Sequence, residues 1–182
     1  MSQNTTTAQP RTVQTADRGK LDVRALVLLA ILLAAGFILN MTLGNALAIV
    51  GIKPQFIIAA YALTIALTNA NLGQAAIYGL LSAAVIQLTT SIPGLNFATE
   101  LVAALVMSAL VRTGVCRGLN PLVAAFLTTL VSGGLFAVAG TVMMGAELAT
   151  AVVKVPIVLG TAVFNAAVVQ TLFFPLNKVL GK

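Results

Sequence analysis

The sequence predicts an all-α membrane protein built as a bundle of six transmembrane helices. Of its 182 residues, 59% are hydrophobic and only 8% are charged, and the mean hydropathy is +1.05. Soluble domains carry about a quarter charged residues, so this composition excludes an ordinary soluble enzyme, a nucleic-acid-binding protein and a disordered chain. The charges are also unevenly spread, because four long stretches contain no Asp, Glu, Lys or Arg, namely 25–52, 54–99, 118–146 and 155–177.

The first three spans follow from dividing these stretches at turn-forming residues, because a spanning helix needs about 20 mostly apolar residues. The first predicted span covers 25–40 and leads into a looser segment that contains two glycines. A second span opens at Pro54, since proline is tolerated at the first helical position, and ends near 68. The polar cluster at 69–74 predicts a tight turn, and a third span follows over 75–91.

The last three spans are separated by a Pro-Gly break and by a basic connection. The Pro-Gly pair at 93–94 ends the third helix, and the fourth span is predicted over 97–111. The fifth and sixth spans are predicted at 122–144 and 155–176, where Pro175 marks the end of the last helix.

The orientation follows from the distribution of Lys and Arg. Residues 1–22 are poor in bulky apolar side chains and are expected to form a disordered cytoplasmic tail, which leaves 23–182 as the transmembrane domain. A signal peptide is an alternative for the first apolar run, but a long polar segment precedes it and no small-x-small cleavage site follows. With the tail inside, the outer segments hold only Lys53 and Lys154, and the inner segments hold Arg11, Arg18, Lys20, Arg24, Arg112, Arg117, Lys178 and Lys182. The positive-inside rule therefore predicts a multi-pass protein of the cell membrane with both termini in the cytoplasm.

Several kinds of chemistry are excluded by the residues that the chain lacks. It has no His, and Cys116 is its only cysteine, so disulfides, thiolate or imidazole metal sites and Ser-His-Asp catalysis are not available. It also contains no P-loop and cannot itself hydrolyse a nucleotide. We therefore expect no enzymatic activity, no cofactor and no metal.

Charged residues near the outer ends of the spans are the first candidates for a binding site, because charges at membrane depth are costly and usually functional. Glu100 falls in the first turn of the fourth predicted span, where the helix dipole stabilises a carboxylate. It is either a helix cap at the water interface or an acceptor that faces an external pocket. Lys53 and Lys154 each precede a proline that opens a helix, and they either extend to the interface or pair with a substrate carboxylate. Uncharged donors and acceptors gather toward the same side, namely Gln87, Thr89, Thr90, Asn96 and Asn165.

Small residues recur about one helical turn apart in three spans and allow helices to approach closely in lipid. They are Ala30 and Ala34 in the first span, Gly79 and Ala83 in the third, and Gly133, Ala137 and Gly140 in the fifth. For the third and fifth spans we expect internal packing of the bundle. For the first span, a docking surface for another subunit competes with internal packing.

The order of these features resembles the substrate-binding S component of energy-coupling factor (ECF) transporters, over about residues 23–180. A basic N-terminus leads into a span that carries Ala30 and Ala34, and a Gly-containing outer segment then ends at Lys53-Pro54. Within that superfamily the chain is most similar to the tryptophan transporter TrpP family. The segments that carry this similarity are KPQFII, LTTSIPGLN, TLVSGGLF and FNAAVVQTLFFPLNKVL.

The resemblance implies a six-helix fold of the ECF S-component type with a small-ligand site at its outer side. The site would be built by the loop after the first helix, the loop between the third and fourth helices, and the outer parts of the last three. It also implies that the Ala30–Ala34 face docks on a transmembrane coupling subunit, which two ATPase subunits energise. Aromatic residues are scarce, with no Trp, and Phe97, Phe136 and Phe164 are the candidates for stacking. The full set of expected substrate-binding residues is Lys53, Gln87, Thr90, Asn96, Phe97, Glu100, Lys154, Phe164 and Asn165.

The leading hypothesis is therefore a membrane uptake protein for a small organic nutrient, with tryptophan or a related compound as the first candidate. An S component for a vitamin or another ligand, and a solitary carrier of the same fold that needs no ATPase partner, are alternatives. A non-transporting membrane scaffold is a third. We expect the lipid bilayer as its surroundings and no nucleic acid as a partner.

Overall fold

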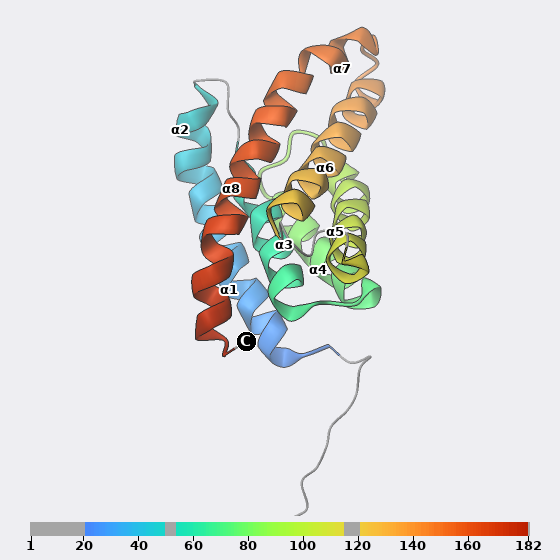
Figure 1. The fold of residues 1–182 in the computed structure, drawn as a ribbon. Helices are drawn as coiled ribbons and strands as arrows, with labels where there is room; N and C mark the ends of the chain where they lie inside the picture. Colours follow the sequence, from blue (N-terminus) through green and yellow to red (C-terminus); the bar gives the residue numbers. More distant parts are fainter. Residues whose placement is uncertain (1–20, 50–53, 115–120, 182) are drawn as a thin grey trace, which may run out of the picture.

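The computed structural model describes residues 21–49, 54–114 and 121–181, and in these ranges the secondary structure is helical (Figure 1). Most of the tail predicted at 1–22, together with Lys53 and Cys116, lies outside the described residues. The elements are α1 (Val23–Leu39), the π-helix η1 (Asn40–Gly44), α2 (Asn45–Ala48), α3 (Phe56–Thr68), α4 (Leu72–Ile86), α5 (Leu95–Thr113), α6 (Leu122–Met143), α7 (Ala149–Val153) and α8 (Val155–Val179).

Four of the described helices are long and apolar enough to cross a membrane: the continuous Val23–Ala48 segment, α5, α6 and α8. The expected class, an all-α membrane protein, is confirmed at this level. α3 and α4 are also apolar, but they have only 13 and 15 residues, fewer than the about 20 that a span usually needs. The count of six spans therefore stays a prediction.

Three helix ends differ clearly from the predicted ones. The third span was expected to reach residue 91 and to end at the Pro-Gly pair, but α4 already ends at Ile86, and a non-helical loop leads on to Pro93-Gly94. The first span was expected to end near residue 40, but the helix continues through η1 into α2, and the Thr42 hydroxyl donates to the Ile38 carbonyl at 2.8 Å along the way. Pro175 was expected to end the sixth span, but it lies inside α8, which continues to Val179. Proline is tolerated inside membrane helices because neighbouring groups can bond the backbone that it frees.

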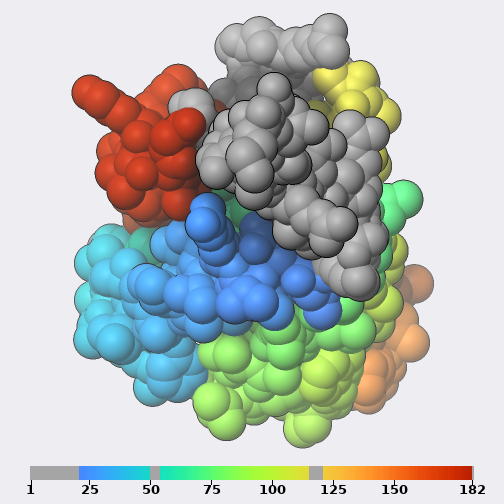
Figure 2. Space-filling view, turned by 90° about the horizontal axis from the view of Figure 1, so that it is seen from below, coloured from blue at the N-terminus to red at the C-terminus, as the bar shows by residue number. Residues whose placement is uncertain are grey.

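α3 occupies the centre of the bundle. Nearly all of its residues are buried, and it packs against α1, α4, α5, α6 and α8. Seen along the bundle from below, α1 lies between α8 on one side and the green α4–α5 region on the other (Figure 2). A short helix that is apolar on every face suits this central place.

A tight turn joins α3 to α4 as predicted, but it is shorter than the expected 69–74, because α4 already begins at Leu72. Asn69 ends α3 in the left-handed conformation, with φ of 49°. Asn71 begins α4 with a capping box, in which its side chain accepts the Gln74 N–H at 2.9 Å and the Gln74 side chain accepts the Asn71 N–H at 3.0 Å. Two of the unpaired N–H groups at this helix start are thereby satisfied.

The small residues of the third and fifth predicted spans pack inside the bundle, as expected. A Cβ atom placed on Gly79 of α4 would lie 2.7 Å from the Glu100 carbonyl oxygen and 2.8 Å from Ala104 Cβ on α5. On α6, a Cβ atom on Gly133 would meet Val158, and one on Gly140 would meet Ile92, each at 2.9 Å. By contrast, both Ala30 and Ala34 on α1 are exposed.

Candidate binding cavity

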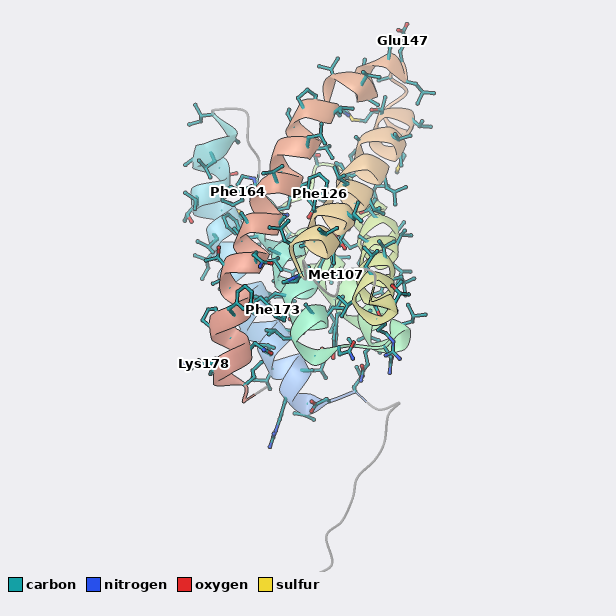
Figure 3. The ribbon with its side chains drawn as sticks, in the orientation of Figure 1. Met107, Phe126, Glu147, Phe164, Phe173 and Lys178 are labelled. Carbon is teal, nitrogen blue, oxygen red and sulfur yellow. The ribbon has the colours of Figure 1, made fainter. Side chains whose placement is uncertain are left out.

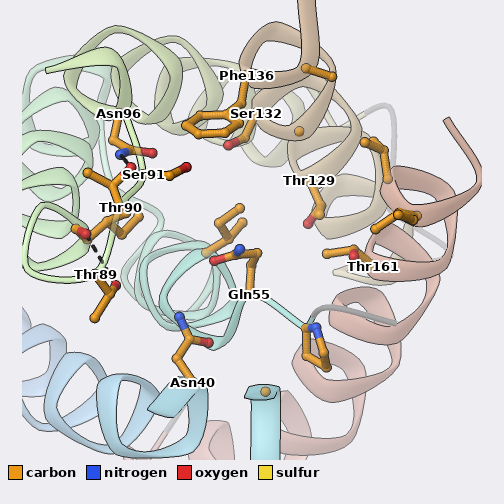
Figure 4. A pocket seen from close by; sticks show the side chains of 18 of the residues that line it. Asn40, Gln55, Thr89, Thr90, Ser91, Asn96, Thr129, Ser132, Phe136 and Thr161 are labelled. Carbon is orange, nitrogen blue, oxygen red and sulfur yellow. Dashed lines mark hydrogen bonds between the residues drawn. The ribbon is translucent and has the colours of Figure 1, made fainter. Parts of the chain in front are cut away.

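A cavity of about 420 Å³ opens among the helices (Figure 4). Its lining includes Asn45 of α2 and Lys154 at the end of α7, so it lies in the half of the bundle where Figure 1 shows these two helices. Its size falls within the range of about 300–1,000 Å³ that is typical of small-molecule sites. η1, the start of α3, the α4–α5 loop, α5, α6 and α8 all contribute to its wall. The polar residues of the lining are Asn40, Asn45, Gln55, Thr89, Thr90, Ser91, Asn96, Glu100, Thr129, Ser132, Lys154 and Thr161.

Glu100 lines this cavity and is only 3% exposed. Its carboxylate accepts hydrogen bonds from the hydroxyls of Tyr61 (2.8 Å), Ser132 (2.6 Å) and Thr99 (3.3 Å), which come from α3, α6 and α5. Such donors are what a buried charge requires, because a carboxylate that leaves water without partners is strongly destabilising. α5 begins at Leu95, two residues earlier than predicted, so Glu100 lies beyond its first turn. Its interpretation as a helix cap at the water interface is therefore wrong.

Lys154 lines the same cavity at the junction of α7 and α8 and is half-buried. Its ammonium donates to the Thr141 hydroxyl at 3.0 Å, and that hydroxyl in turn donates to the Ala137 carbonyl at 2.6 Å. Thr141 is itself buried on α6. The bond to α6 directs Lys154 into the cavity wall, which does not fit the alternative in which its side chain simply extends to the membrane surface.

Two predicted polar residues form the wall between α4 and α5. The Asn96 amide donates to the Thr90 hydroxyl at 2.7 Å, so the loop is fixed to the start of α5. Figure 4 shows both side chains facing the cavity. Gln87 stands behind this loop, where its side-chain oxygen accepts the Gly94 N–H at 3.1 Å, and it does not line the cavity. Gln87 therefore supports the α4–α5 loop.

The aromatic wall differs from the expected one. Phe97 is 39% exposed and lies outside the cavity lining, because on α5 it is turned about 100° from Asn96. Phe164 is also outside, and its ring packs edge-to-face on Phe56, with centroids 5.6 Å apart and planes at 89°. Among the described lining residues, the aromatic ring is that of Phe136 on α6 (Figure 4). Of the three residues predicted to stack on a ligand, only Phe136 lines the cavity.

Asn165 is completely buried on α8 and bonds the backbone beneath the cavity instead of lining it. Its amide oxygen accepts the Gln55 N–H at 3.3 Å, and its amide nitrogen donates to the Gln55 carbonyl at 3.1 Å. The same nitrogen lies 3.4 Å from the Thr129 hydroxyl. Asn165 thereby joins α8 to the start of α3 and to α6.

Several lining residues were missed by the sequence analysis, above all Gln55 and Asn40 near the cavity floor and Thr129 and Ser132 on α6. Thr129 and Ser132 are three residues apart and share a helical face, which was a usable signal. Asn40 and Gln55 are 15 positions apart and are brought together only by the fold, so no local pattern connects them.

Among the residues that the structure describes, no group of three His, Cys, Asp or Glu side chains could hold a metal ion. The part of the lining that the structure describes offers two opposite charges, many hydroxyl and amide groups and one aromatic ring, a set suited to binding a polar small molecule. Comparisons with protein-family models, curated proteins and solved structures give no match to this chain.

Proposed function

We propose that this chain is a membrane uptake protein that binds a small organic nutrient in a cavity open to the extracellular side. The first candidate for the ligand is tryptophan or a related amino acid, and the transport class is the S component of an ECF-type transporter. The observation that carries the proposal is that Glu100 and Lys154 line one cavity within an apolar helical bundle.

The two charges favour a zwitterionic ligand. A free amino acid that leaves water needs a partner for its ammonium and another for its carboxylate, since burying either charge alone costs several kcal/mol. Glu100 is available to the ammonium and Lys154 to the carboxylate, because the bonds that they make in this structure are to neutral hydroxyls. Phe136 offers a surface for an aromatic side chain.

The membrane orientation that this function requires is supported by the placement of the basic residues. Arg24 lies in the first turn of α1, and Arg112 and Lys178 lie in the last turns of α5 and α8. All three are exposed. In Figure 1 the start of α1 and the end of α8 lie at the end of the bundle away from α2 and α7. Figure 3 shows Lys178 at this end and Glu147 at the opposite end. Under the positive-inside rule this end faces the cytoplasm and the cavity faces outward. In this arrangement α3 and α4 complete six spans.

A partner surface is part of the proposal. Ala30 and Ala34 are exposed on α1, and small exposed residues one turn apart allow a second helix to approach closely in lipid. The partner would be the transmembrane coupling subunit, which two ATPase subunits energise. A solitary carrier of the same fold would not need this surface. Substitutions on it therefore distinguish an ECF S component from a solitary carrier.

Calorimetry on the purified protein in detergent tests the ligand directly. L-Tryptophan should bind with a stoichiometry of one, whereas indole, which lacks both charges, should bind far more weakly. A panel of vitamins and other amino acids, screened by thermal shift, identifies the ligand if tryptophan is not bound. A protein that binds no member of the panel would favour the scaffold alternative.

A further inference from the structure

Gln55 precedes α3 and lines the cavity. We propose that the amide of Gln55 is a specificity-determining contact for the ligand, and that Asn165 and Asn40 are positioning residues that hold it in place. This inference rests on the proposed function, because it concerns the same cavity.

The first step concerns the backbone at the start of α3. The first N–H groups of a helix have no partner within it, and the residue before the helix usually bonds one of them with its own side chain. Gln55 occupies that position but makes no such bond. Instead, the Asn40 side chain accepts the Phe56 N–H at 2.8 Å, and the Asn165 side chain accepts the Gln55 N–H at 3.3 Å.

These two asparagines come from distant parts of the fold. Asn40 belongs to η1 and Asn165 to α8, so the start of α3 is fixed from both sides of the bundle. Asn165 also donates to the Gln55 carbonyl at 3.1 Å, and the Gln55 backbone is therefore bonded at both of its polar groups. π-helical turns such as η1 occur frequently at functional sites. In this protein the π-helix η1 contains Asn40, whose side chain bonds the Phe56 N–H at the start of α3.

The second step concerns the Gln55 side chain. Because the two asparagines have taken over the capping of α3, the Gln55 amide makes no hydrogen bond to any residue in the described ranges. It lines the cavity and lies near the middle of the ring of lining side chains in Figure 4. The hydroxyls of Thr129 and Ser132, by contrast, donate to Ala125 and Glu100.

The chemistry of a free primary amide defines what it recognises. It offers one acceptor and two donors, so it matches a neutral ligand group that both donates and accepts, or a pair of such groups. Charges on the ligand are left to Glu100 and Lys154, which line the same cavity. A site built to hydrogen-bond a ligand group rejects analogues that lack it, because the amide is then left without a partner. Gln55 would thus select among ligands of equal charge.

Calorimetry with L-tryptophan as the probe tests the contact. Gln55→Leu should weaken binding by about three- to tenfold, the range for one neutral hydrogen bond. The matched control is Gln170→Leu, which removes an amide from α8 outside the cavity and should leave the affinity unchanged. If the parent binds tryptophan and Gln55→Leu binds it equally well, the inference is overturned while the proposed function stands.

Cysteine labelling tests the placement without any ligand. In a Cys116→Ser background, Gln55→Cys should react with a water-soluble thiol reagent, and Ile57→Cys, at a fully buried position, should not. Adding Asn165→Leu should change the Gln55→Cys labelling rate severalfold. If Asn165→Leu does not fold, Asn165→Asp replaces it in the same measurement, because Asp keeps the acceptor for the Gln55 N–H and loses the donor to the Gln55 carbonyl.

These labelling results decide the inference even if the parent binds no tryptophan, an outcome that removes the proposed substrate. An unreactive Gln55→Cys, or a labelling rate that is independent of Asn165, would overturn it. A reactive cysteine whose rate depends on Asn165 supports it, whatever the ligand proves to be.

Discussion

Gly79 of α4 lies directly against the backbone of Glu100 on α5, so closely that a Cβ atom on Gly79 would come within 2.7 Å of the Glu100 carbonyl oxygen. The absence of a side chain at this one position lets the two helices touch where α5 carries its buried carboxylate. The depth of Glu100 in the bundle thus depends on a residue that does not line the cavity.

Substituting Gly79 should therefore destabilise the protein. Gly79→Ala must push α5 outward, and overpacking of this kind typically costs about 1–3 kcal/mol. The control is Gly134→Ala on α6, where a Cβ atom would meet nothing within 4 Å. Thermal unfolding in detergent should give a lower midpoint for Gly79→Ala than for Gly134→Ala, and equal midpoints would contradict the close packing of α4 on α5.

Glu100→Gln should weaken amino-acid binding more than it lowers the yield of folded protein. The change keeps the shape of the side chain but removes its charge, and hydrogen bonds to charged groups contribute about 1.5–3 kcal/mol, or roughly ten- to a hundredfold in affinity. Glu147→Gln is the control, because Glu147 is exposed and lies outside the cavity lining. Unchanged tryptophan affinity in calorimetry would limit Glu100 to a structural role.

Lys154→Met should weaken binding of an amino acid but not of its amide or ester, because only the free acid carries the carboxylate that Lys154 would pair with. The measurement is calorimetry with tryptophan and tryptophanamide on the parent and the variant. Lys178→Met is the matched control, since Lys178 is exposed in the last turn of α8. An equal loss for both ligands would show that Lys154 acts on the shape of the cavity.

Ala30→Trp combined with Ala34→Trp should block a partner helix while leaving ligand affinity largely intact, because both positions are exposed and lie outside the cavity. Copurification with a coupling subunit is the measurement, and it should fall. Val163→Trp, at an exposed position on α8, is the control for added bulk in the membrane. Undiminished complex formation and uptake would favour a solitary carrier.

The orientation is tested in intact cells, again with Cys116 replaced. Ala146→Cys, in the connection between α6 and α7, should react with an impermeant thiol reagent added outside. Gly118→Cys, between α5 and α6, should react only after the cells are opened. The reverse pattern would place the cavity on the cytoplasmic side.

The sequence was sufficient to place most helices, because the uncharged stretches and their Pro, Gly and Asn breaks mark helix ends directly. The turn at Asn69 and Asn71 is an example, since the residues that cap the end of α3 and the start of α4 are only two positions apart in the chain. The end of α8 was misplaced because Pro175 stops a helix in water more reliably than it does in a membrane.

The candidate site could be predicted only in part. Glu100 and Lys154 were recognised because a charge in an apolar sequence is conspicuous, and Asn96 and Thr90 because they lie near the Pro-Gly break. Phe97 was misassigned because a polar neighbour does not reveal which face of a helix an aromatic residue occupies. Gln55 and Asn165 are 110 positions apart, and no local pattern connects them.

The shortness of α3 bears on how a solute would cross. With 13 residues at 1.5 Å each, α3 extends only about 20 Å, and the cavity begins at its first turn, where Gln55 and Ile58 line the floor. Under the proposed orientation, a solute held there would lie within the hydrocarbon layer, which is about 30 Å thick. Beyond the cavity floor the centre of the described bundle is filled by α3, whose side chains are nearly all buried. If the protein carries a solute across the membrane as we propose, α3 must therefore move relative to its neighbours, because its packed side chains leave no open path along this helix.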